Sequence, residues 1–222
     1  MPVQLNGATS GSVTITAPAV AGTNTLTLPA VTDTLVGLAA TQTLTGKTLT
    51  SPTITGAVMS SMGSSVLTSG TAQASTSGTS LDFTSIPSWV KRITVMFNVV
   101  STSGTSLIQI QLGSTTFTTT GYVSSAGSIN TGTGQAGSTT GFAITSGTSA
   151  TASQSGAITL SLLNASTYNW VSSGNLMYTS TTGAIHLSAG AVTLSGVLDR
   201  VRITTVNGTD TFDAGTINIM YE

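Results

Sequence analysis

Alternation of apolar and polar residues is the main pattern in the second half of the chain. Ile93, Val95 and Phe97 occupy every second position, and the spacing recurs at Ile217 and Ile219. Successive side chains of a strand point to opposite faces, so each set shares one face of a sheet. The predicted strands span residues 79–83, 92–100, 106–112, 121–124, 142–145, 157–163, 168–173, 175–180, 184–188, 191–194, 200–206 and 216–221. Short strands at this spacing favour a β-sandwich, jelly-roll-like, over residues 79–222.

Two stretches interrupt this pattern. Residues 125–155 are mostly Gly, Ser and Thr and are predicted to form a long exposed loop. Residues 59–78 are rich in Ser, Gly, Thr and Ala, and are predicted to be a neck or linker before the sandwich.

The N-terminal residues 1–37 form a smaller unit in this interpretation. Residues 12–16 alternate, as do residues 25–28, and the turn-forming segment between them contains Pro, Gly and Asn. Two such runs indicate a hairpin or a pair of short strands. Pro29 ends the second run because proline cannot donate to a strand ladder.

Residues 38–58 carry a different repeat. Leu44, Leu49 and Ile54 are five positions apart, with threonines between them. In a monomer this thin apolar edge would not offset the backbone entropy of ordering, about 1–2 kcal/mol for each residue. Three chains around an axis would bury the three positions as stacked layers. The segment therefore predicts a short trimeric β shaft.

Composition narrows the possible partners and compartments. Charged residues are 5% of the 222, the net charge is −1, and there is no cysteine. This balance offers no electrostatic attraction for nucleic acid, and no apolar run is long enough for membrane insertion. A hydrophobic content of 39% argues against disorder of the whole chain. The N-terminus lacks the pattern of a signal peptide. A Thr-rich β protein with so few charges is typical of an exported surface protein, yet no export signal is found. A virion component, made in the bacterial cytoplasm and released by lysis, would remove this conflict.

Residues that could support catalysis are few. His186 is the only histidine, and alternation places it opposite Ile185 and Leu187, as a surface or interface side chain. Glycosidases need two carboxylates at a fixed separation. Asp199 is expected to pair with Arg200 or Arg202, and Asp210 follows an Asn-Gly turn signal. The sequence predicts no enzyme activity, no metal site and no cofactor.

Binding of a surface ligand is the more plausible activity. Tyr168, Asn169 and Trp170 form the most suggestive aromatic and amide cluster, and Tyr122 adjoins the Gly/Ser-rich segment, which favours its exposure. The alternative for Trp170 is a place in the core or in an interface. Trp89, after an Ile-Pro pair, is expected in the core.

Three segments resemble parts of tailed-bacteriophage fibre and virion-appendage proteins. Residues 11–29, GSVTITAPAVAGTNTLTLP, resemble their recurrent N-terminal module, and residues 38–54, LAATQTLTGKTLTSPTI, resemble the linker that often follows it. Family members commonly have Asn where Gly46 stands. Residues 86–98, IPSWVKRITVMFN, are similar to a knob domain of phage and prophage tail proteins. The resemblance implies a virion location, a homotrimer, attachment to other virion proteins through residues 1–37, and a distal knob.

Two functions follow from these expectations. The first is a trimeric tail fibre whose knob touches a host-surface glycan or protein. The second is a head fibre, decoration or connector protein with a purely structural role. An exposed aromatic patch at the tip of the knob would favour adhesion, whereas a tip of Gly, Ser and Thr alone would favour decoration.

Overall fold

The computed structural model describes residues 3–6, 8–16, 20, 22–23, 48, 50, 67–129, 134–179 and 183–222. These residues form antiparallel strands, turns and loops, with no helix among them, which confirms the predicted all-β class. The chain divides into two compact units, Met1–Ala57 and Val58–Glu222. The predicted axis residues Leu44, Leu49 and Ile54 lie outside the described residues.

The first unit contains a two-stranded hairpin. Strand β1 (Val3–Asn6) pairs with β2 (Ser12–Ile15) in antiparallel register. The partner of the predicted strand at residues 12–16 is therefore β1, and the other predicted run, residues 25–28, lies outside the described residues. Leu5 and Ile15 are diagonal neighbours on one face of the hairpin, and their side chains are 55% and 49% exposed.

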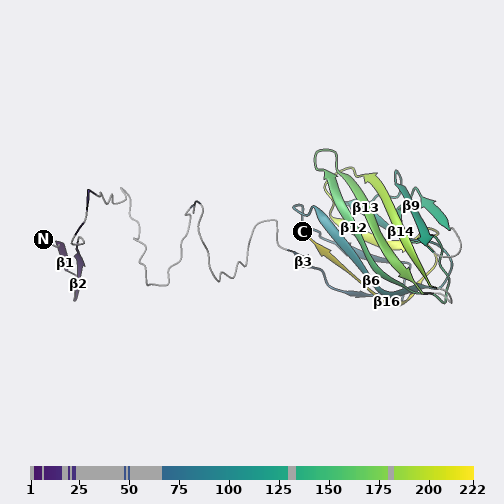
Figure 1. Ribbon diagram of the computed structural model, residues 1–222, viewed down its shortest axis with the longest axis horizontal. Helices are drawn as coiled ribbons and strands as arrows, with labels where there is room; N and C mark the ends of the chain where they lie inside the picture. The colour runs from purple at the N-terminus through teal and green to yellow at the C-terminus, as the bar shows by residue number, and fades with distance from the viewer. Residues whose placement is uncertain are drawn as a thin grey trace. The chain divides into compact units, whose positions relative to one another are not determined.

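The second unit is dominated by a large antiparallel sheet (Figure 1). Its strands are β3 (Thr68–Ser69), β4 (Gln73–Ala74), β6 (Arg92–Thr102), β9 (Val123–Ile129), β10 (Gln135–Ser138), β12 (Gln154–Asn164), β13 (Asn169–Tyr178), β14 (Ala184–Thr193) and β16 (Phe212–Tyr221). Their spatial order is β10-β9-β14-β13-β12-β6-β16-β3, and β4 also pairs with β16.

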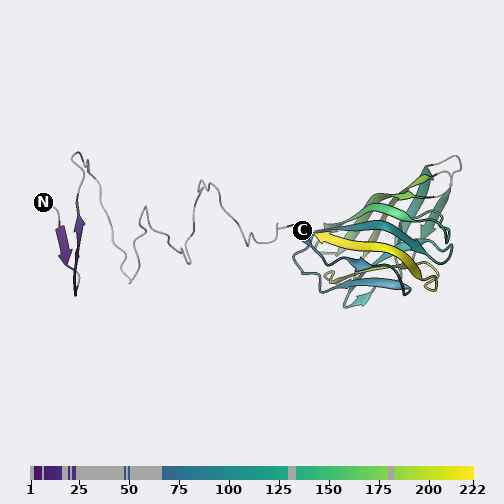
Figure 2. The same cartoon turned by 90° about the horizontal axis from the view of Figure 1, so that it is seen from below.

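A smaller antiparallel sheet covers one face of the large one (Figure 2). It contains β5 (Ser80–Thr84), β7 (Ile108–Ser114), β8 (Thr116–Phe117), β11 (Phe142–Ala143) and β15 (Arg200–Thr205). The order is β11-β7-β15-β5, with β8 paired to β7, so β5 forms an edge.

The core lies between the two sheets and follows the predicted alternation. Ile93 and Val95 of β6, Ile158 and Leu160 of β12, and Ile110 of β7 are all fully buried. Each belongs to a set at every second position. Burial of one face of each sheet against the other supplies the apolar contact that stabilises this unit.

Two segments expected to be loop or linker belong to the sandwich. Residues 125–155 contain most of β9, all of β10 and the first residues of β12, together with β11, which falls within the strand predicted at residues 142–145. In the expected neck, β3 and β4 pair with β16, which places residues 68–74 in the large sheet. The Gly, Ser and Thr residues of these segments had suggested loops. In the structure, their small side chains allow a strand to pack close to the strands beside it.

Glycine inside strands explains a second difference. Residues 168–180 and 184–194 were each expected to contain two strands, yet β13 passes through Gly174 and β14 passes through Gly190 without a break. A Cβ at Gly174 would lie 2.4 Å from the carbonyl oxygen of Ala157, and one at Gly190 would lie 2.7 Å from a ring atom of Phe142. These glycines allow close approach inside the sheet rather than a turn.

Candidate functional site

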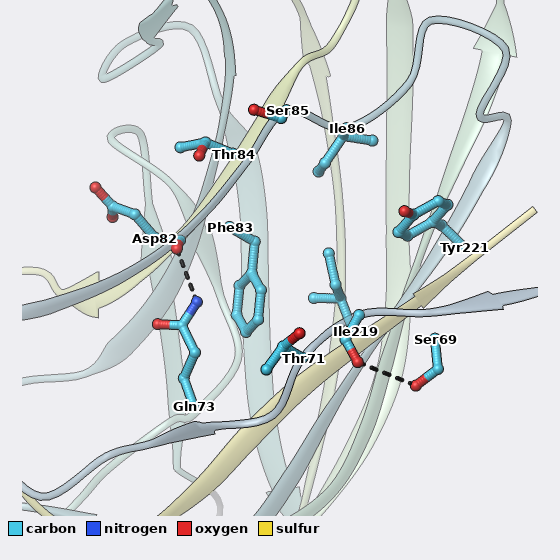
Figure 3. A pocket seen from close by; sticks show the side chains of 11 residues that line it. Ser69, Thr71, Gln73, Asp82, Phe83, Thr84, Ser85, Ile86, Ile219 and Tyr221 are labelled. Atoms are coloured by element: carbon cyan, nitrogen blue, oxygen red, sulfur yellow. Dashed lines mark hydrogen bonds between the residues drawn. The ribbon is translucent and has the colours of Figure 1, made fainter.

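A groove opens where the edge strand β5 of the small sheet faces the β3–β4 segment and β16 of the large sheet (Figure 3). Its volume is about 390 Å³. The lining residues are Ser69, Gly70, Thr71, Gln73, Asp82, Phe83, Thr84, Ser85, Ile86, Ile219 and Tyr221. It is larger than two other hollows of the sandwich, which have volumes of about 270 and 40 Å³.

The wall formed by residues 69–73 is held by contacts to both sheets. The N–H of Gly70 donates to the carbonyl of Ile219 at 2.8 Å, and a Cβ at Gly70 would lie 2.9 Å from the Ile219 side chain. On the other side, Nε2 of Gln73 donates to the carbonyl of Asp82 at 2.9 Å. Gln73 thus ties the backbone edge of β5 to the large sheet and closes one end of the groove (Figure 3).

The rim of the groove includes an unusual backbone conformation. Ser85 has a φ of 61°, the left-handed region that residues other than glycine rarely occupy. The next residue is anchored, because the N–H of Ile86 donates to the carbonyl of Asp199 at 3.0 Å and its side chain is buried. Strained residues that surrounding structure holds in place are common at binding sites.

The chemistry of the groove suits hydrogen bonding to a neutral ligand. Serine and threonine hydroxyls line it together with the phenol of Tyr221, whose ring lies 5.9 Å from that of Trp89. Asp82 is the one carboxylate among the lining residues. Both of its oxygens accept from Arg202, with Nε–Oδ1 and Nη2–Oδ2 distances of 2.7 Å. The lining therefore lacks the second carboxylate that acid–base hydrolysis of a glycoside needs.

Arg202 links the groove to a charged cluster on the outer face of the small sheet. Its guanidinium carbon lies 4.0 Å from the centre of the Phe117 ring, and that of Arg200 lies 5.7 Å from the same ring. Arg200 also donates to both carboxylate oxygens of Asp199, and this hydrogen bonding lowers the pKa of Asp199 below its usual value. Of the two partners predicted for Asp199, Arg200 is the one that it pairs with, and Arg202 pairs with Asp82 instead.

His186 lies on the face opposite Ile185 and Leu187, as alternation predicted, but this face is buried and the expected surface position was wrong. Its side chain is 2% exposed, whereas Ile185 and Leu187 are 47% and 45% exposed. The ring packs edge-on against Tyr178, with centroids 5.1 Å apart. Burial lowers the pKa of His186 below its ordinary value. The prediction failed because β14 turns its polar side chain toward the interior, where Ser146 offers hydrogen-bond partners.

The four predicted ligand-binding residues do not form one open surface. Tyr122 was expected to be exposed but is 2% exposed, and its hydroxyl accepts from the N–H of Leu112 at 2.7 Å. Burial raises its pKa. Trp170 is also 2% exposed and lies in the core, the alternative that the sequence had left open.

The remaining two predicted residues are partly buried beside Trp170. Tyr168 lines a narrow hollow of about 40 Å³ together with Trp170 and Val197. The side-chain amide of Asn169 donates to Oγ1 of Thr193 and accepts from Oγ1 of Thr167. The oxygen and the NH2 group of that amide are therefore both already hydrogen-bonded. The hollow itself is too small for a sugar ring.

Comparison with known protein families, curated proteins and solved structures finds no match. Within the part of the chain that the structure describes, no three His, Cys, Asp or Glu side chains gather as a metal site. The described residues also include no helix with the length and apolar character needed to cross a bilayer.

The residues that line the groove were not predicted from the sequence. Ser69, Thr71 and Gln73 lie in the stretch predicted to be a linker, where hydroxyl side chains suggest solvent-exposed chain. Tyr221 was recognised only as part of an alternating strand. The pairing of residues 68–74 with β16 brings these residues next to β5, and that pairing leaves no local signal in the sequence.

Proposed function

We propose that this chain is a structural protein of a bacteriophage virion, a homotrimeric tail fibre with an N-terminal attachment unit, a short trimeric shaft and a jelly-roll-like distal knob. The observation that carries the proposal is the division of the chain into one unit with a small, apolar-faced hairpin and another with a large β-sandwich. The resemblance of residues 11–29, 38–54 and 86–98 to fibre proteins supports the same arrangement.

The hairpin is the proposed attachment element. A lone two-stranded hairpin is marginally stable in water and needs further apolar packing. Leu5 and Ile15 share one face and are about half exposed, so a partner that covers them would stabilise β1 and β2. In a fibre, that partner is another virion protein, which residues 1–37 contact.

The shaft is proposed for residues 38–58, with Leu44, Leu49 and Ile54 stacked around the three-fold axis. Because the chain has few charges, burial of these three apolar side chains would be the interaction that holds the trimer together. Such burial depends little on salt, unlike pairs of surface charges.

The knob would present the groove near Tyr221 to the host surface. Hydroxyls, the Gln73 amide and an aromatic ring are groups that recognise a neutral saccharide, and the open groove has room for one or two sugar rings. This site replaces Tyr122 and Trp170 as the candidate for glycan contact. The proposal includes no enzyme activity, no cofactor and no contact with nucleic acid or membrane.

A second candidate function is a head fibre, decoration or connector protein without a dedicated ligand. The burial of Tyr122 and Trp170 favours it, because an exposed aromatic patch on the knob was the feature expected of an adhesin.

Light scattering on the full chain tests the assembly. We expect three times the mass of one chain at both low and high salt, and a monomer would contradict the fibre architecture. A glycan screen then separates the two functions. Binding that Thr71→Val removes and the exposed control Thr209→Val retains would support adhesion through the groove. No binding by a trimeric wild-type chain would favour the structural role.

A further inference from the structure

The outer face of the large sheet carries an apolar row that is about half exposed among the described residues. We propose that this row, Ile129 of β9, Ile185 of β14 and Met177 of β13, packs against the same row in other copies of the chain. This inference rests on the homotrimer proposed above and adds a contact surface on the knob itself.

Strand register places the three side chains side by side. Ile185 pairs with Ile129 on one side and with Met177 on the other, so the three form a line across adjacent strands. Their side chains are 62% (Ile129), 47% (Ile185) and 49% (Met177) exposed. Leu187 lies two residues from Ile185 on the same face and is 45% exposed. Apolar side chains gathered in neighbouring positions indicate an interaction surface, whereas scattered ones do not.

The charge distribution points to a copy of the same chain as the occupant. Strands β9, β12, β13 and β14 contain no Asp, Glu, Lys or Arg. The small sheet, by contrast, carries the Asp82–Arg202 pair, and the Asp199–Arg200 pair lies at its edge. A neutral apolar row offers no charge for a charged partner to recognise, and copies of it meet without repulsion. Depletion of charge with enrichment of aliphatic and Met side chains is typical of the centre of an interface.

Packing of this row around a three-fold axis would leave the small sheet on the outside of the trimer. The small sheet, with Phe117 and its two Arg–Asp pairs, would remain in solvent, where charged side chains are favoured. The uncharged strands β9, β12, β13 and β14 and the charged small sheet would then have separate roles, the first in assembly and the second in contact with solvent.

Single cysteines test the contact in the full chain, which has no cysteine of its own. Met177→Cys treated with a short bismaleimide should give covalent dimers, because the same residue of two copies lies within reach. Thr84→Cys is the control, an exposed position on β5 of the small sheet, and should remain uncross-linked.

A charge placed in the row provides a second test. Ile185→Lys, added to Met177→Cys, should strongly reduce the covalent dimer. Val197→Lys should leave it unchanged, since Val197 has the same 47% exposure but lies outside the row.

Light scattering on the same samples separates the two proposals. A monomeric parent chain would overturn both the homotrimer and this contact. A trimer whose residue 177 does not cross-link, or whose residue 84 cross-links equally well, would overturn the contact and leave the homotrimer standing. A trimer with dimers at residue 177 alone, lost in Ile185→Lys, would establish it.

Discussion

The backbone N–H of Ser146 donates a 2.9 Å hydrogen bond to Nδ1 of the buried His186. A donor at that distance requires Nδ1 to be an acceptor, so the imidazole is neutral and carries its proton on Nε2. Protonation would place a second hydrogen on Nδ1, facing the Ser146 N–H, inside an environment that already disfavours charge. The hydrogen bond from Ser146 and the burial of the ring therefore both favour the neutral form of His186.

His186 should make folding stability depend on pH below neutrality. Burial lowers its pKa from the ordinary 6.5, so the unfolded chain binds a proton at a higher pH than the folded chain. The contribution of His186 to the free energy of unfolding should be constant above about pH 7 and should fall as the pH drops below 6.5 toward the folded-state pKa. Each pKa unit corresponds to about 1.4 kcal/mol. Urea unfolding at a series of pH values measures this.

His186→Gln is the matched variant for this prediction. Its amide oxygen can still accept from Ser146, but the side chain does not titrate. The variant should lose the dependence between pH 6.5 and the folded-state pKa, while retaining any change below pH 4 from Asp199 and Asp210, whose pKa values are lowered from 3.8 by hydrogen bonding. An equal pH dependence in both proteins would contradict the assignment to His186.

Tyr122→Phe should destabilise the sandwich without altering its shape. The hydroxyl accepts from the buried N–H of Leu112, and its removal leaves that donor without a partner, at a cost of about 1–3 kcal/mol. Tyr168→Phe is the control, since its hydroxyl makes no hydrogen bond to the described residues, and it should change stability little. Chemical denaturation compares the two, and equal losses would argue against the Leu112 contact as the cause.

Gly174→Ala should also be destabilising. Its new methyl group would lie 2.4 Å from the carbonyl oxygen of Ala157, a backbone atom that can move only with the sheet. Forcing extra volume into a packed site costs about 1–3 kcal/mol. Gly147→Ala has open space around the added methyl and should leave the melting temperature nearly unchanged. A neutral Gly174→Ala would mean that β12 and β13 can separate without cost.

Leu49→Asp should disperse the trimer. Three carboxylates brought to the proposed axis would repel each other and would lose hydration, whereas three leucines would be buried there on assembly. Thr48→Asp, one position away, serves as the control and should retain the trimeric mass. Light scattering measures both variants, and an unchanged trimer in Leu49→Asp would remove Leu49 from the proposed axis.

Much of the strand content could be predicted from local pattern. The alternating residues around Ile93, Ile110, Ile158 and Ile217 are buried as expected, because a period of two follows from strand geometry alone. The prediction failed where side chains were small. Gly174 and Gly190 were interpreted as breaks, and residues 125–155 as a loop, because glycine and serine carry the same local signal in a turn and in a tightly packed strand.

The candidate site could not be predicted in the same way. Its walls come from residues 69–73, 82–86 and 219–221, which are far apart in the chain. The pairing of β3 and β4 with β16 and the hydrogen bond from Gln73 to the Asp82 carbonyl bring them together. The predicted ligand residues Tyr122 and Trp170 are buried, because an aromatic side chain on a strand packs equally well on either face until a second layer covers one of them.

The sequence by itself determined the all-β class, the low charge and the apolar sets that form the core, since these depend on residue type and a spacing of two. Tertiary structure decided which face of each strand is inside. In β14 the apolar Ile185 and Leu187 point outward and His186 points inward, because the small sheet and Ser146 cover that face. Register and layer packing are relations between distant segments, and no local pattern of residues contains them.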